Sequence, residues 1–232
     1  YNRGQYGPLR TAYLERVAAI AESSVPIQGV QQLINSEALT FAADWGQEAF
    51  ALRQVDSLRA SVSPPWSYVL EVPAVQIHLD RGDVESARAS LGGLRALNEA
   101  FGEAPGRTAR IVWAEGRLAW VEDGDCERGL ESFRSAQELS EGNLTYLAWT
   151  AACLIELERF DEAEPDVAYL VERVPGDPKA RLLAAEVYAG LGRPDEAVSA
   201  LELALDTWAG ADPDFRPAAE ARALLEELQA AG

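Results

Sequence analysis

The chain has 232 residues, 48% of them apolar, and a formal net charge of −18 at pH 7. A single lysine, Lys179, accompanies 38 acidic residues. The sequence therefore lacks the basic face with which proteins bind nucleic acids or anionic lipid surfaces. No run approaches the roughly 20 apolar residues of a membrane span, so we expect neither a nucleic-acid nor a membrane partner. Methionine is absent, which we interpret as the sign of a piece of a longer protein or of a processed form.

The acidic residues are scattered along the chain and do not form one run. One interpretation is a strongly hydrated surface suited to a salty, halophile-like cytoplasm. The other is an acidic groove that binds a basic partner. The sequence leaves both open, and in the salt-adapted case stability should rise as salt screens the repulsion between carboxylates.

The first predicted element is an amphipathic helix over 8–23, interpreted as the second half of a repeat. A weaker helix pair follows over 30–60, and a clearer pair covers 68–98 with its turn at Gly82. Extra residues interrupt the regular spacing near 63–65, and a longer insertion over 99–106 is expected to form a loop.

Three further helix pairs are predicted over 110–140, 144–175 and 178–208. The small residues Gly129, Ala163 and Ala197 open their second helices at intervals of 34 residues, and small residues at such positions let two helices approach closely. Arg117 occupies a small-residue position in the first of these pairs, so the register is expected to slip by about one residue there. A last helix over 216–230 is expected to cap the apolar end of the array.

A period of about 34 residues, with one helix–turn–helix per period, resembles the tetratricopeptide repeat family over nearly the whole chain. The resemblance implies a single all-α domain over 1–232. Its fold would be a right-handed superhelical solenoid of antiparallel helix pairs, with about five pairs, a leading half repeat and a C-terminal capping helix. The segment 205–214 and the helix after it also resemble the end of repeat regions in bacterial multidomain signalling proteins. Such proteins often carry an N-terminal kinase, cyclase or transcription-regulator domain.

The sequence contains no recognisable catalytic or cofactor motif. His78 is the only histidine and is interpreted as a buried or half-buried structural residue, because no nucleophile in a recognisable context accompanies it. Cys126 and Cys153 lack metal-binding spacing. They are expected to be reduced in a cytoplasmic protein, although the sequence leaves a disulfide between them open. We expect no catalytic residue, no cofactor and no metal.

In the tetratricopeptide repeat family, the first helix of each pair lines the concave face. The resemblance places the following candidate partner-binding residues there: Ile34, Phe41, Val72, Gln76, Leu79, Leu118, Val121, Ala148, Ile155, Leu182 and Glu186. The lysine and asparagine residues with which the family binds acidic C-terminal peptides are missing from these positions, which disfavours that ligand. The set is mostly apolar, so it either forms a groove for an apolar or helical segment or packs on itself in a tight superhelix.

The leading functional hypothesis is a non-catalytic scaffold for protein–protein contacts, with a protein or peptide as its partner. One alternative is a regulatory or sensor region for an N-terminal effector in the same polypeptide. Another is a small-molecule-binding repeat domain. Because a cut solenoid exposes apolar surface, we also expect homo-oligomerisation through the N-terminal end.

Overall fold

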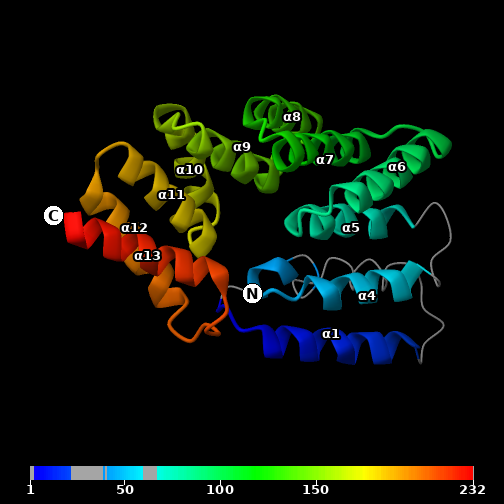
Figure 1. Cartoon of the computed structure of the whole chain (residues 1–232), viewed down its shortest axis with the longest axis horizontal. Helices are drawn as coiled ribbons and strands as arrows, with labels where there is room; N and C mark the ends of the chain where they lie inside the picture. The colour runs from blue at the N-terminus through cyan, green and yellow to red at the C-terminus, as the bar shows by residue number, and fades with distance from the viewer. Residues whose placement is uncertain (1–2, 22–38, 40, 60–66, 232) are drawn as a thin grey trace.

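The computed structural model describes residues 3–21, 39, 41–59 and 67–231, and these residues form an all-α fold (Figure 1). The described N-terminal residues include α1 (Tyr6–Ala21), the short 3-10 helix η1 (Ala42–Trp45) and α4 (Glu48–Arg59). The expected first helix of the pair over 30–60, the candidate residue Ile34 and the insertion near 63–65 lie outside the described residues.

From residue 68 onward, each helix packs against the next one along the chain. The helices are α5 (Tyr68–Asp80), α6 (Val84–Ala100), α7 (Pro105–Asp123), α8 (Cys126–Leu139), α9 (Leu144–Glu156), α10 (Phe160–Arg173), α11 (Pro178–Gly190), α12 (Pro194–Thr207) and α13 (Arg216–Ala231). The second helices α8, α10 and α12 start 34 residues apart, as the spacing of the small residues predicts. Helices packed in sequential pairs confirm the predicted fold class.

Local sequence signals explain where these helices begin. The side chains of Asp83, Asp125 and Asp177 accept hydrogen bonds from backbone N–H groups in the first turns of α6, α8 and α11. These bonds satisfy donors that have no partner within the helix. Pro178 and Pro194 stand in the first turns of α11 and α12, where the fixed φ of proline suits a helix start.

The turn inside each pair depends on one left-handed residue. Gly124 and Gly192 have φ values of 67° and 70° between α7 and α8 and between α11 and α12. The equivalent residue between α9 and α10 is Glu158, which has a φ of 55°. Glycine adopts this conformation readily, whereas a residue with a Cβ atom is strained in it.

The insertion over 99–106 is not the loop that the sequence predicted. Helix α6 extends through Ala100, and α7 begins at Pro105, so only four residues connect them. Glu99 and Ala100 are good helix formers that continue α6, while Pro105 is suited to the first turn of α7. The extra residues therefore lengthen two helices and leave a short connection.

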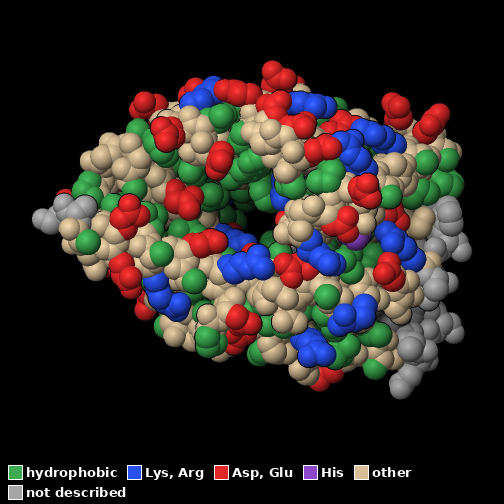
Figure 2. Space-filling model, viewed as in Figure 1, with side chains coloured by type: hydrophobic (Ala, Val, Ile, Leu, Met, Phe, Trp, Pro, Cys, Tyr) green, Lys and Arg blue, Asp and Glu red, His purple; other side chains and the backbone are tan. Residues whose placement is uncertain are grey.

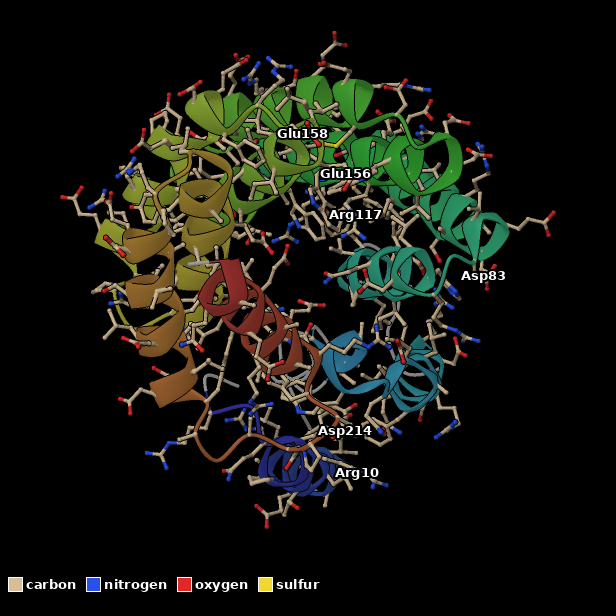
Figure 3. The ribbon with its side chains drawn as sticks, turned by 60° about the vertical axis from the view of Figure 1, so that its left-hand side comes forward. Arg10, Asp83, Arg117, Glu156, Glu158 and Asp214 are labelled. Atoms are coloured by element: carbon tan, nitrogen blue, oxygen red, sulfur yellow. A yellow bond between two sulfur atoms is a disulfide. The ribbon has the colours of Figure 1, made fainter. Side chains whose placement is uncertain are left out.

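The array curves until its two ends meet, so that the helices form a ring (Figure 3). One apolar core contains residues from α1, η1, α4 and α5 together with residues from α11, α12 and α13. Tyr6 and Tyr13 of α1 are buried, and Leu14 is a large exposed apolar side chain on the same helix. The apolar face of α1 is thus covered within the chain, and homo-oligomerisation through this end stays a prediction.

Candidate functional site

The inner surface of the ring is formed by the first helices of the pairs, α5, α7, α9 and α11, together with α13. Figure 2 shows the face of the molecule hollowed between these elements. We call this region the inner surface. The described candidate residues predicted from the sequence lie beside η1 or on these first helices, and their burial divides them into two groups.

Three candidates, Leu79, Leu118 and Leu182, are buried. The other described candidates are half-buried, and none is fully exposed: Phe41, Val72, Gln76, Val121, Ala148, Ile155 and Glu186. The half-buried apolar side chains of α5, α7 and α9 pack with one side against the core and keep part of their surface accessible.

Leu118 differs from its expected position. It lines a second recess, which we call the outer groove, together with residues of α6, α7 and α8. The register slip at Arg117 explains this difference, since one residue corresponds to about 100° on a helix. The slip turns Arg117 toward α5 and α9 and leaves Leu118 on the side of α6 and α8.

Arg117 joins three of the first helices. Its Nη2 donates a hydrogen bond of 3.0 Å to Oδ1 of Asp80 on α5, and its guanidinium lies 3.7 Å from the ring centre of Trp149 on α9. The Arg117 side chain is only 6% exposed, and its Nε and Nη1 atoms find no acceptor among the described residues. Burial raises the pKa of the Asp80 carboxyl despite the nearby charge of Arg117. The sequence drew attention to Arg117, but nothing in it identified Asp80 and Trp149 as its partners.

A second charged pair closes the ring between η1 and α11. The Nζ atom of Lys179 lies 2.7 Å from Oδ2 of Asp44 and 5.2 Å from the ring centre of Phe41. Only 32% of the Lys179 side chain and 17% of the Asp44 side chain are exposed. The single lysine of this acidic chain therefore helps to hold its N-terminal and C-terminal parts together.

Glu186 lies on the inner side of α11, where α13 packs. Burial and the neighbouring charge of Glu220 on α13 raise the pKa of Glu186 to about 7. Removal from water and a nearby like charge both disfavour the ionised form of a carboxyl group relative to its neutral form. The contact between α11 and α13 thus favours the protonated form of Glu186, which is about half populated near pH 7.

The outer groove has a volume of about 490 Å³ and is lined mainly by charged side chains. Arg88 pairs with Glu122, and Arg95 lies 2.6 Å from Glu115. Both pairs connect α6 to α7 over an apolar floor that includes Leu118. The charges of these two arginines are thus neutralised within the protein.

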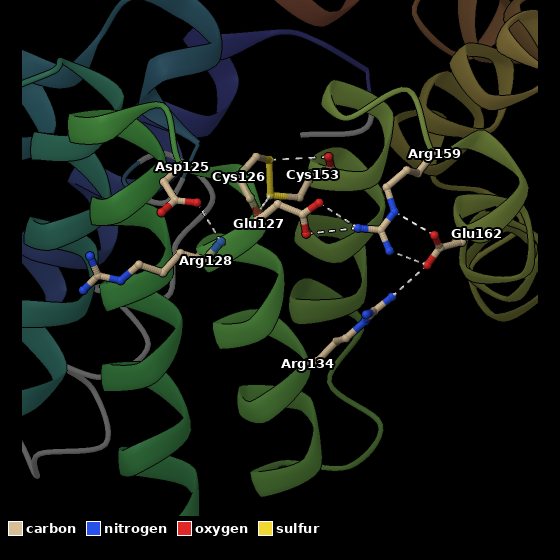
Figure 4. Close-up of polar contacts among 8 residues, drawn as sticks. All are labelled: Asp125, Cys126, Glu127, Arg128, Arg134, Cys153, Arg159 and Glu162. Atoms are coloured by element: carbon tan, nitrogen blue, oxygen red, sulfur yellow. Dashed lines mark hydrogen bonds and ion pairs between the residues drawn. A yellow bond between two sulfur atoms is a disulfide. The ribbon is translucent and has the colours of Figure 1, made fainter.

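The two cysteines form a disulfide, so the expectation of reduced thiols is wrong (Figure 4). Cys126 is the first residue of α8 and Cys153 lies in the last turn of α9. Because α8 and α9 pack side by side, this end of each helix meets the other, with the two Cα atoms 5.6 Å apart. Nearby, Arg159 at the start of α10 pairs with Glu127 of α8 and with Glu162 of α10, which joins the first turns of α8 and α10.

His78 is half-buried at the end of α5, with its Nδ1 atom 3.4 Å from Oδ2 of Asp83. This Asp83 carboxylate also caps α6. Among the described residues, no group of three histidine, cysteine or acidic side chains could hold a metal ion. Every helix in the same part of the chain is too short or too polar to span a bilayer.

Comparisons with known proteins agree with this architecture. Residues 153–214 match the tetratricopeptide repeat family, and no curated protein matches the sequence. The solved structure of TTC0263, a thermophilic TPR protein in Thermus thermophilus, has a TM-score of 0.63 and 18% identity. The alignment covers 87% of this chain and 100% of that chain.

Two further structures are similar at lower scores. A tetratricopeptide repeat protein from Parabacteroides merdae ATCC 43184 has a TM-score of 0.50 and 16% identity, over 84% of this chain and 76% of that chain. YrrB, described as a TPR protein with an unusual peptide-binding site, has a TM-score of 0.47 and 19% identity, over 90% of this chain and 97% of that chain. The chain therefore has a tetratricopeptide-repeat-like fold of sequentially paired helices, and its residues 153–214 match the tetratricopeptide repeat family in sequence.

Proposed function

We propose that this chain is a non-catalytic protein-interaction scaffold whose inner surface binds a segment of a partner protein. Tetratricopeptide repeat domains typically act as such scaffolds. The observation that carries the proposal is the incomplete burial of apolar side chains on three successive first helices. These side chains are Val72 on α5, Val121 on α7, and Ala148 and Ile155 on α9.

An apolar strip of this kind suits a helical or extended segment that inserts apolar side chains. Figure 2 shows apolar side chains beside the hollow of the molecule, and α13 packs on α11. A partner segment would therefore lie along α5, α7 and α9. The charged pair of Arg117 and Asp80 lies among these helices and would orient polar groups of that segment.

A peptide-display selection on the full chain tests this proposal. We expect enriched peptides to lose at least about tenfold in affinity when Ala148 is changed to arginine, because the long side chain would fill the strip. The matched control is Leu203→Arg, since Leu203 is 49% exposed on α12. Peptides that bind both variants equally well, or a selection that enriches no peptide, would refute the proposal.

A second candidate is a small-molecule site in the outer groove, because its volume of about 490 Å³ lies within the usual range for such sites. Arg88 and Arg95 are already paired there, so a ligand would have to displace an internal carboxylate. We rank this candidate second. A screen of charged metabolites by thermal shift, repeated with Arg95→Ala, would support it if a ligand raised the Tm of the wild type alone.

The disulfide bears on the compartment in which the scaffold acts. Disulfides persist in oxidising compartments and are rare in the cytosol, and both cysteines of this chain are buried in one disulfide. This pairing favours an oxidising compartment over the cytoplasm that we expected from the sequence. Thiol labelling of protein that is isolated from its natural source and denatured without reductant tests this proposal. Unlabelled cysteines would support an oxidising compartment, whereas labelled cysteines would favour the cytoplasm.

A further inference from the structure

The C-terminal segment is held by the N-terminal segment through a group of contacts that we call the clasp. The backbone N–H of Asp212 donates to the carbonyl oxygen of Gly4 over 2.8 Å. In return, the Asp212 carboxylate accepts a hydrogen bond of 2.6 Å from the N–H of Tyr6. The Gln5 side chain donates to the carbonyl oxygen of Gly210 over 3.0 Å. These bonds join parts of the chain more than 200 residues apart.

Aromatic side chains fill the apolar part of the clasp. Phe215 is fully buried, with its ring centre 4.7 Å from that of Trp45 and 5.4 Å from that of Trp208. Gly4 has a φ of 65°, and a Cβ atom at this position would lie only 2.6 Å from the Cβ atom of Ala211. The N-terminal segment is therefore shaped to receive the segment around residue 211.

The clasp fixes the position of α13, which projects into the ring (Figure 3). Helix α13 packs against α11, α12 and η1. Leu182 of α11 is buried in the core to which α13 contributes, and Glu186 of α11 interacts with the charge of Glu220 on α13. Two of the candidate partner-binding residues therefore lie where the chain's own C-terminal helix packs.

We infer that residues 209–231 act as an internal ligand that covers the α11 end of the inner surface, and that a partner reaching this end must release the clasp. The inference rests on the proposed function, because it describes how the same inner surface is regulated. Burial of the Glu186 carboxyl beside α13 weakens the internal contact when this group is ionised. The hydrogen bonds of Asp212 oppose this effect and keep the clasp closed. Release of the clasp would uncover Leu182 and Glu186 and extend the apolar strip of α5, α7 and α9.

A competition assay on the full chain tests the inference with a fluorescent synthetic peptide of residues 209–231. Asp212→Ala removes a charged acceptor in the clasp, so the added peptide should bind about tenfold more tightly than it binds the wild type. Asp214→Ala is the matched control, because this neighbouring carboxylate is exposed (Figure 3) and, within the described residues, accepts no hydrogen bond from the N-terminal segment. It should leave the affinity unchanged.

Hydrogen exchange gives an independent readout. The backbone N–H groups of Tyr6 and Asp212 should exchange faster in Asp212→Ala than in the wild type, with unchanged protection in α7–α10. Should Asp212→Ala fail to fold, Gln5→Ala removes a single exposed hydrogen bond and should give a smaller change in the same direction. Equal peptide affinity and equal exchange in the wild type and the clasp variants would overturn the inference.

The coupling to partner binding is measured with peptides from the display selection. Selected peptides that reach α11 should bind the Asp212→Ala variant more tightly than the Asp214→Ala variant. Equal affinity for both variants would overturn the inferred coupling between release of the clasp and partner binding. The assay with the 209–231 peptide needs no partner. Failure of the clasp can therefore be distinguished from failure of the proposed inner-surface site.

Discussion

Replacement of Glu158 by glycine should stabilise the protein. Glu158 occupies the turn between α9 and α10 with a φ of 55°, whereas the equivalent turns contain Gly124 and Gly192 with φ values of 67° and 70°. The Glu158 side chain is exposed, and within the described residues no hydrogen bond or ion pair holds it. The substitution therefore changes the backbone strain and little else in the folded state.

Two opposing terms set the size of the effect. The left-handed conformation costs a residue with a Cβ atom about 1–2 kcal/mol, and glycine avoids this strain. Glycine also gives the unfolded chain more freedom, which lowers stability by about 0.5–1 kcal/mol. The net gain in the free energy of unfolding should be about 0.5–1 kcal/mol, which corresponds to a rise in Tm of about 1–4 °C for a chain of this size.

Thermal and urea unfolding of Glu158→Gly and Glu158→Ala would separate backbone strain from charge. Glu158→Ala removes the same carboxylate but keeps a Cβ atom, so it should leave the Tm nearly unchanged. Gly192→Ala should lower the free energy of unfolding by about 1 kcal/mol, because alanine is strained at this positive φ. A Cβ atom at residue 192 would meet no other group within 4 Å, so no steric clash adds to this loss. If Glu158→Gly gave no gain, or if Glu158→Ala gave the same gain, backbone strain at Glu158 would not limit the stability of the protein.

Three further predictions concern the buried polar groups and the disulfide. Arg117→Met should lower the free energy of unfolding by about 3 kcal/mol because it leaves Asp80 buried without its partner, and urea unfolding should show that adding Asp80→Asn recovers at least half of this loss. Glu186, whose pKa is raised from 4.5 to about 7, stabilises the fold when protonated. The free energy of unfolding should therefore fall by up to roughly 3 kcal/mol as the pH rises from about 4.5 to 7, and Glu186→Gln should abolish that part of the pH dependence. Reduction of the disulfide between Cys126 and Cys153, which are separated by 27 residues, should cost about 3–4 kcal/mol, as measured by urea unfolding with and without dithiothreitol.

The helix pairs could be predicted because their signals are local. A small residue every 34 positions, a capping aspartate such as Asp177 and a turn glycine such as Gly192 recur along the array. Each of these features acts through neighbours only a few residues away. The proposal that the apolar side chains of α5, α7 and α9 share one face rests on the same signals and stays a prediction.

Closure of the ring could not be predicted because it depends on contacts between distant segments. Nothing local marks Gly4 and Asp212 as partners, and the stacking of Phe215 on Trp45 depends on the accumulated curvature of the whole array. The sequence predicts a slip in register at Arg117, but not that its side chain lies against α5 and α9. Its partner Asp80 lies in the preceding helix pair, beyond the reach of periodicity.

The pairing of the cysteines was missed for a related reason. The sequence contains no metal or redox motif around Cys126 and Cys153, so it favours reduced thiols. The spatial neighbourhood arises from the junction of α8 with α9, which brings the first residue of one helix to the last turn of the other. The helix boundaries, known to within one turn, would have placed the two residues together.

We propose that a partner segment binds along the inner surface of α5, α7 and α9. Hydrogen exchange of the full chain, with and without a display-selected peptide, tests it most directly. Bound peptide should give new protection on these helices around Val72, Val121 and Ile155, with unchanged exchange around Arg88 and Arg128 at the outer groove. Protection confined to the outer groove, with none on α5 and α9, would contradict it.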